Sequence, residues 1–256
     1  MKTVIVQHTI QENQLEWNLQ HISTLMDQQR GADLYILAET FATGFLAKDS
    51  AEKAGEQSRQ IFSWLQQQAR RFDAAIAGSV ASVDDEGQLR NRLFFVRPDG
   101  SYDYYDKRHL FGFAGETDEY VAGERRVVVE WRGVRFLLQV CYDLRFPVFS
   151  RNHGDYDAII YVANWPVRRR EVWQTLLKAR AIENQCYVVG VNRVGHDAVC
   201  EYIGDSVVIN AYGQAVVSCT PGMTETAAAI LDMDELMRFR KKFPVLQDAD
   251  KFEVMR

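Results

Sequence analysis

Apolar and polar positions in the first half of the chain follow two periods, one typical of helices and one of buried strands. Apolar side chains recur every three or four residues over roughly 12–29 and again from Ile61 to Phe72, which predicts two amphipathic helices. Short runs rich in apolar residues predict strands before, between and after these helices. The predicted strands span Thr3–Gln7, Leu34–Ala38, Ala75–Val83 and Asn91–Arg97.

The second half mixes the same two patterns. A hairpin is expected where Val127–Trp131 and Val134–Val140 flank Arg132-Gly133, and helices are expected over Glu171–Gln185 and Met233–Lys242. The other predicted strands are Asp157–Ala163, Tyr187–Asn192, Ser206–Asn210 and Ala215–Ser218. This mixture of hairpins and helical crossovers favours an α/β fold with helices outside two stacked sheets over a barrel of regular βα repeats. No linker-like stretch or repeat divides the chain, so residues 1–256 are interpreted as one domain.

Composition and charge limit the kinds of protein to which this sequence could belong. The 256 residues are 47% hydrophobic and 25% charged, an ordinary globular balance. The net charge of −5 and the dispersed basic clusters argue against a nucleic-acid partner. Apolar runs such as Ala158–Ala163 are far shorter than the roughly 20 residues that span a bilayer, and the N-terminal stretch lacks the apolar region of a signal peptide. We therefore expect a cytoplasmic protein without a membrane partner.

The four cysteines are widely separated and form no Cys-x-x-Cys pair, so neither a zinc site nor a redox motif is predicted. One of them occupies a distinctive place. Cys141 follows the predicted strand Val134–Val140, and a side chain at such a junction points outward at the end of a sheet, as in the nucleophile elbow of other hydrolases. Backbone N–H groups of the following turn would stabilise a thiolate and later an oxyanion. Free cysteines are also common as small core residues, and position alone leaves both interpretations open.

Glu39 and Lys107 are two further candidates. Glu39 ends the apolar run Leu34–Ala38, where partial burial would raise the pKa of its carboxyl toward the range useful for proton transfer. The alternative is a glutamate that simply leaves the core for solvent. Lys107 lies among aromatic residues and not in a solvated run of lysines, which makes it a candidate functional residue. The alternative interpretation is a surface lysine whose aliphatic stem packs on an aromatic ring.

Taken in order, the segments around these three residues resemble the Glu–Lys–Cys signatures of the nitrilase superfamily. The segments are Leu37-Ala-Glu39-Thr-Phe41, Tyr105-Asp-Lys107-Arg-His-Leu-Phe111 and Val140-Cys141-Tyr-Asp-Leu-Arg-Phe-Pro147. The resemblance continues through Tyr161-Val-Ala-Asn-Trp-Pro166, Ala179-Arg-Ala-Ile-Glu-Asn-Gln185, Asn192-Arg-Val-Gly195 and Gly204-Asp-Ser206, and so covers nearly the whole chain. The segment after the cysteine is similar to the Nit amidase branch. True nitrilases usually carry a Cys-Trp-Glu type of segment, so nitrile hydrolysis is not expected.

The resemblance implies a four-layer α-β-β-α sandwich that commonly forms a homodimer. It also implies that Cys141 is the nucleophile, Glu39 the general base, and Lys107 the group that stabilises the thiolate and the oxyanion. Glu116 matches the family's second glutamate, which positions substrate or water, although Glu119 lies close by in the sequence. Neither a metal nor an organic cofactor is implied.

Within this branch, the sequence looks most like the bacterial omega-amidases. Those enzymes hydrolyse the terminal amide of 2-oxo dicarboxylate monoamides such as 2-oxoglutaramate and 2-oxosuccinamate. Arg145 is expected to hold the substrate carboxylate through its fork-shaped guanidinium, or alternatively to form a structural ion pair with an acid such as Asp143. Further substrate contacts are expected from Tyr142, Phe41 and Trp165.

Several alternatives remain open at this point. The natural substrate could instead be deaminated glutathione or a broad range of short-chain aliphatic amides. A papain-like cysteine–histidine pair would need His109, His153 or His196 as its base, and none of these lies in a recognisable partner motif. A binding relative without catalysis is a further alternative, against which the intact Glu39, Lys107 and Cys141 argue.

Overall fold

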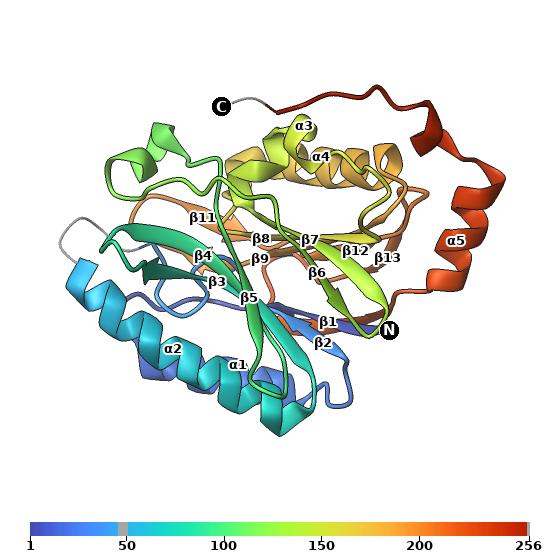
Figure 1. The fold of residues 1–256 in the computed structure, drawn as a ribbon. Coiled ribbons are helices and arrows are strands. Elements are labelled where there is room, and N and C mark those ends of the chain that lie inside the picture. The colour runs from blue at the N-terminus through green and yellow to red at the C-terminus, as the bar shows by residue number, and fades with distance from the viewer. Residues whose placement is uncertain (46–50, 255–256) are drawn as a thin grey trace.

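The computed structural model describes residues 1–45 and 51–254, and within them the chain forms two large sheets and a small one (Figure 1). In spatial order, the first sheet contains β14 (Glu225–Ile230), β1 (Lys2–Gln7), β2 (Leu34–Ile36), β3 (Ala75–Val83), β4 (Leu89–Val96) and β5 (Tyr102–Asp106). The second contains β13 (Ala215–Ser218), β12 (Val207–Ile209), β9 (Tyr187–Asn192), β8 (Ala158–Ala163), β7 (Val134–Val140) and β6 (Val128–Trp131). The small sheet pairs β10 (Val194–His196) with β11 (Glu201–Ile203).

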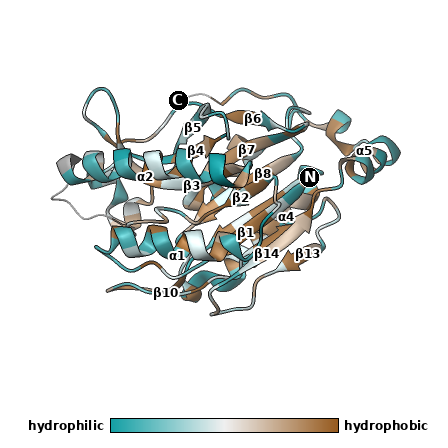
Figure 2. Ribbon diagram, turned by 90° about the horizontal axis from the view of Figure 1, so that it is seen from below, coloured by the Kyte–Doolittle hydropathy of each residue, from teal (hydrophilic) through white to brown (hydrophobic). Residues whose placement is uncertain are grey.

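Helices cover the outer faces of the two large sheets. On these faces lie α1 (Leu15–Asp27), α2 (Ala51–Phe72), α3 (Pro147–Ser150) and α4 (Arg170–Glu183). Helix α5 (Met233–Lys242) lies at the side of the sheets, and its Leu236 belongs to the hydrophobic cluster between them. Figure 1 shows α1 and α2 on one side of the stacked sheets, and α3 and α4 on the other. Figure 2 shows hydrophobic residues concentrated in the strands and hydrophilic residues along the outer turns of α1 and α2. The expected four-layer α-β-β-α sandwich is therefore confirmed.

Three hydrophobic clusters correspond to the three interfaces between these layers. The largest lies between the sheets, where residues such as Ile36 and Phe95 meet Phe136 and Leu138. A second cluster joins α1 and α2 to the outer face of the first sheet, and a third joins α4 to the second sheet. Because nearly every core strand is buried on both faces, these strands read in the sequence as continuous apolar runs.

Strand direction brings the candidate residues to one edge. In the first sheet β2 runs parallel to β1 and β3, and in the second sheet β8 runs parallel to β7 and β9. Two antiparallel pairings, of β3 with β4 and of β4 with β5, return β5 to the direction of β3. The ends of β2, β5, β7 and β8 are followed by Glu39, Lys107, Cys141 and Asn164. Ligands of open α/β sheets bind at this carboxyl edge.

Most predicted elements are confirmed, and most of their ends shift by only a few residues. The helix predicted from Ile61 to Phe72 is an exception, because α2 begins at Ala51 and its first ten residues are mostly polar. The helix over Met233–Lys242 has the predicted bounds, and the side chain of Asp232 caps it by accepting the N–H of Glu235. The predicted strand Leu34–Ala38 is shorter than expected, because regular pairing ends at Ile36. Strands β5, β10, β11 and β14 were not predicted. No helix in the described part of the chain is long and apolar enough to cross a membrane.

Candidate active site

Cys141 directly follows β7, at a sharp turn, and is the first residue of a short 3-10 helix, Cys141–Arg145. Its φ of 46° is in the left-handed region, which is uncommon for a residue other than glycine. The side chain is half-buried and lines a cavity, while it also packs against the cluster between the sheets. The backbone therefore has the strained strand-to-helix turn expected of a nucleophile elbow.

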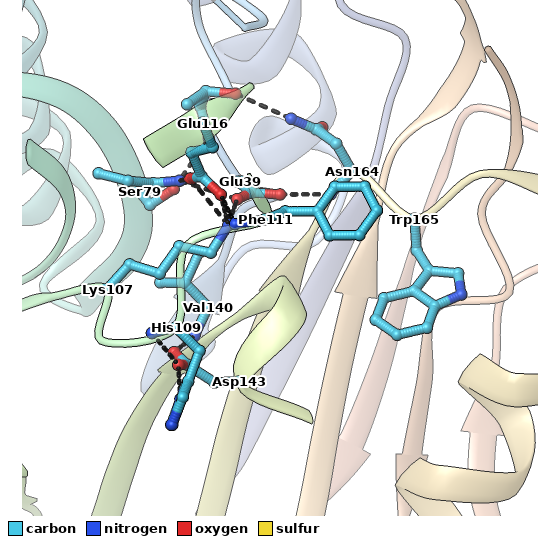
Figure 3. Close-up of polar contacts among 12 residues, drawn as sticks. Glu39, Ser79, Lys107, His109, Phe111, Glu116, Val140, Asp143, Asn164 and Trp165 are labelled. Atoms are coloured by element: carbon cyan, nitrogen blue, oxygen red, sulfur yellow. Dashed lines mark hydrogen bonds and ion pairs between the residues drawn. The ribbon is translucent and has the colours of Figure 1, made fainter. Parts of the chain in front are cut away.

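Asp143 holds this turn in place from inside the protein. The fully buried carboxylate accepts hydrogen bonds from the N–H of Val140 at 2.9 Å and from the hydroxyl of Tyr105 at 2.8 Å. It also binds the backbone N–H and the ring Nδ1 of His109, at 3.0 and 2.7 Å (Figure 3). Because Tyr105 belongs to β5 and Val140 to β7, Asp143 links the two sheets next to Cys141. The alternative ion pair between Arg145 and Asp143 is not present among the described contacts.

Glu39, Lys107 and Glu116 form a buried ion cluster, and each side chain is about 1% exposed. The ammonium of Lys107 donates to Oε1 of Glu39 at 3.0 Å, and to both carboxylate oxygens of Glu116 at 2.9 and 2.8 Å (Figure 3). Two carboxylates and one ammonium give the cluster a formal charge of −1. Burial of unequal charge is costly, and clusters of this kind are typical of reactive sites.

Two asparagines that the sequence analysis did not single out orient the carboxylates. The side-chain amide of Asn91, in β4, donates to Glu39 at 2.8 Å and to Glu116 at 3.2 Å. The backbone N–H of Asn164 donates to Oε2 of Glu39 at 2.8 Å, and its side chain donates to Thr40 at 2.9 Å. Glu39 is thus held from both sheets, and its orientation toward the site is firmly determined.

The pKa of two groups is displaced by this environment. Burial would lower the pKa of Lys107, but the charges of Glu39 and Glu116 outweigh it and raise that pKa well above its usual value. Burial raises the pKa of Cys141 well above its usual value, and Glu39 adds to the rise. Lys107 lowers the pKa of Cys141, as expected from the sequence, but this effect is smaller than the opposing effects of burial and Glu39. These shifts favour the neutral thiol of Cys141 over its thiolate.

A cavity of about 40 Å³ opens at Cys141. Three of the four expected substrate contacts, Arg145, Tyr142 and Trp165, line it. The other lining residues are Phe111, Asn164, Pro166 and Arg169. The guanidinium of Arg145 lies 5.5 Å from the centre of the Trp165 ring, a cation–π arrangement. Arg169 was interpreted from the sequence only as part of a dispersed basic cluster.

The prediction that Phe41 contacts the substrate is wrong. Phe41 is fully buried in the cluster beneath α1 and α2, where its ring lies 5.9 Å from that of Trp64. The chain turns sharply at Thr40, whose φ is 41°, so Glu39 and Phe41 point to different sides of the sheet. Proximity in the sequence to Glu39 was a poor guide here, because the alternation that would place residues two apart on one face is broken by the turn at Thr40.

The structure also places the other candidates that the sequence left open. The carboxylate of Glu116 binds Lys107, whereas Glu119 is half-buried nearby and contacts Glu116 through its backbone N–H, which donates to the carbonyl of Glu116 at 3.3 Å. His109 is bound to Asp143, His153 packs on Phe252, and His196 is exposed in β10. Across residues 1–45 and 51–254, no group of three or more His, Cys, Asp or Glu side chains could hold a metal ion.

Comparisons with known proteins show the family of this chain. The family model for carbon-nitrogen hydrolases matches residues 2–241, so the chain belongs to the carbon-nitrogen hydrolase family. It is accordingly a hydrolase that acts on carbon–nitrogen bonds of amides, as expected.

Two proteins of known name and one solved structure are similar to the chain over most of its length. The chain is 46% identical over 253 residues to omega-amidase YafV of Yersinia enterocolitica, with 98% of each protein covered. It is 31% identical to 2-oxoglutaramate amidase of Bacillus subtilis, covering 88% of this chain and 87% of that protein. Among solved structures, XC1258 of Xanthomonas campestris, a CN-hydrolase superfamily protein with an arsenic adduct in its active site, matches with a TM-score of 0.95. That match has 40% identity and covers 100% of this chain and 99% of the other.

Proposed function

We propose that this protein is an omega-amidase, which hydrolyses the terminal amide of 2-oxo dicarboxylate monoamides such as 2-oxoglutaramate and 2-oxosuccinamate. The similarity to omega-amidases over nearly the whole chain supports the activity. The observation that carries the substrate class is Arg145, an exposed guanidinium that lines the same cavity as Cys141. A guanidinium binds a carboxylate bidentately and remains charged in a partly dry site, so it suits a substrate with a carboxylate opposite its amide.

The acylation step follows from the buried cluster. Glu39 accepts the thiol proton as the sulfur of Cys141 forms a bond to the amide carbon. A protonated Glu39 is a weaker acceptor, so Lys107 can redirect one N–H from it to the developing oxyanion. The backbone N–H of Tyr142 would donate to the same oxygen. Glu39 then returns its proton to the amide nitrogen, the carbon–nitrogen bond breaks, ammonia leaves, and a thioester remains on Cys141.

Deacylation uses the same groups, with water as the attacking group and the thiolate as the leaving group. Glu39 takes a proton from water as the water oxygen attacks the thioester carbon, and Lys107 again stabilises the oxyanion. Collapse breaks the carbon–sulfur bond, the thiolate recovers its proton from Glu39, and the 2-oxo dicarboxylate leaves. Glu116 keeps Lys107 in position through two short hydrogen bonds and orients the attacking water.

Ammonia release tests the proposal. The purified protein is expected to hydrolyse 2-oxoglutaramate with a higher kcat/KM than deaminated glutathione or butyramide. Replacing Arg145 by lysine should reduce kcat/KM for 2-oxoglutaramate by at least about tenfold and affect butyramide much less. Preference for deaminated glutathione or for butyramide would assign the alternative activity. Equal losses on both substrates would mean that Arg145 supports the turn after Cys141 instead of binding the substrate.

We also propose that the protein is a cytoplasmic homodimer without a nucleic-acid or membrane partner. The family resemblance is the main support for the dimer. Exposed apolar side chains near α4 and α5, such as Ile182, Tyr212 and Phe243, offer a surface that a second copy would cover. Light scattering at micromolar concentration should give twice the 29.5 kDa mass of the chain, and a monomer mass would contradict the dimer.

A further inference from the structure

Three consecutive arginines after β8 have three different environments. Arg170 forms a bidentate ion pair with Asp205, with distances of 2.6 and 2.9 Å. Arg168 is exposed and donates to the carbonyl of Val199 at 3.4 Å, away from the cavity. Arg169 is half-buried and lines the cavity that contains Cys141. Only the middle arginine of the three therefore faces the candidate active site.

Aromatic rings and the chain itself hold Arg169 at the cavity. Its guanidinium carbon lies 5.1 Å from the ring centre of Phe111 and 5.8 Å from that of Phe113. The indole N–H of Trp165, another lining residue, donates to the carbonyl of Arg169 at 2.8 Å. A guanidinium over a ring keeps its N–H donors, which lie in its own plane, available to another partner.

Neither Arg145 nor Arg169 forms an ion pair with any acid in the described residues, in contrast to Arg170 beside them. A cavity of about 40 Å³ has room for roughly three water-sized groups, enough for the amide end of a substrate. The rest of the substrate must extend outward, past side chains of the cavity wall. A 2-oxo carboxylate presents three oxygens close to one plane, and a single bidentate guanidinium can satisfy two of them.

We propose that Arg169 is a specificity-determining residue that binds the 2-oxo carboxylate end of the substrate together with Arg145. This inference rests on the proposed function for its choice of substrate. It adds a second cationic contact, made by the chain segment after β8 and braced by Phe111. Phe111 donates its backbone N–H to Glu116 at 2.6 Å, so the aromatic wall behind Arg169 is tied directly to the buried ion cluster.

The test compares Arg169→Gln with Arg168→Gln, which removes the same charge one residue away and outside the cavity. For 2-oxoglutaramate, Arg169→Gln should raise KM and lower kcat/KM by at least about tenfold, whereas butyramide hydrolysis should change less than about threefold. Arg169→Lys should give an intermediate loss, because lysine keeps the charge but not the fork. Arg168→Gln should resemble the wild type on both substrates.

A binding measurement separates this inference from the proposed function. Calorimetric titration of glutarate into Cys141→Ala protein, with and without Arg169→Gln, reports the carboxylate contact without turnover. Weaker glutarate binding in the double variant supports the inference even if 2-oxoglutaramate is a poor substrate. Unchanged glutarate affinity overturns it, and so does an equal loss of activity on butyramide and 2-oxoglutaramate, which would reveal a merely structural role.

Discussion

Replacing Glu116 by glutamine changes the buried cluster by one oxygen and one charge. The wild-type carboxylate accepts four hydrogen bonds, two from Lys107 and one each from Asn91 and Phe111. A glutamine accepts only through its single carbonyl oxygen, and its NH₂ group must face donors on the other side. In either orientation of the amide, two of the four hydrogen bonds are lost.

The magnitude follows from these losses. At least one lost bond involves the Lys107 ammonium, and hydrogen bonds to charged groups contribute roughly 1.5–3 kcal/mol each. Removing one partner of a buried ion pair costs about 3–5 kcal/mol. If about 3 kcal/mol of this loss falls on the transition state, kcat decreases by more than about 100-fold. Alkylation of Cys141 should persist, because the charge of Glu116 raises the pKa of the thiol and its removal lowers that pKa.

The assay measures ammonia release at saturating 2-oxoglutaramate, together with iodoacetamide labelling of Cys141 and the thermal midpoint. Glu119→Gln is the matched control, since it alters a neighbouring acid that lies outside the cluster. Turnover of Glu116→Gln within threefold of the wild type would refute the reasoning. A Glu119→Gln variant that lost activity while Glu116→Gln kept it would show that the second acid had been misassigned.

Three further predictions concern the groups around the thiol. Cys141→Ala should abolish turnover while circular dichroism remains that of the wild type; iodoacetamide should label Cys141 of the wild type before the buried Cys186 and Cys219. Glu39→Gln should also stop turnover. Because Glu39 raises the pKa of Cys141, this variant should react with iodoacetamide at a lower pH than the wild type, and an upward shift of that pH profile would contradict the electrostatic argument. Asp143→Asn should lower both the thermal midpoint and kcat, the latter by at least about tenfold, since it weakens the hydrogen bonds that hold the turn; an unchanged kcat would count against that positioning role.

The sequence predicted the fold best where strands are buried on both faces. Val134–Val140 and Tyr187–Asn192 were located with their observed bounds, because continuous apolar runs leave little ambiguity. The unpredicted strands are at edges or in the small sheet. Tyr102–Asp106 contains only tyrosine and aspartate, and Glu225–Ile230 is mostly alanine and threonine, so neither has the apolar signal of a core strand. Their strand character comes from pairing with β4 and β1, which is a tertiary effect.

Some residues of the candidate site could likewise be predicted from the sequence, and others could not. Glu39, Lys107 and Cys141 carry distinctive neighbours in the sequence and could be found from them. Asn91 lies in the middle of an ordinary strand, and only the packing of the sheets shows that its amide joins two carboxylates. Arg169 lies between two other arginines, and nothing in the local sequence indicates that Arg169, and neither neighbour, lines the cavity.

The buried ion cluster and the rim of the cavity are built from different parts of the chain. Glu39 and Lys107 are enclosed between the sheets, where nearly any substitution disturbs charge balance and packing. Arg145 and Arg169 lie in short segments after β7 and β8 that are partly open to solvent. New substrate preferences could therefore arise by a few changes at the rim while bond cleavage is left intact.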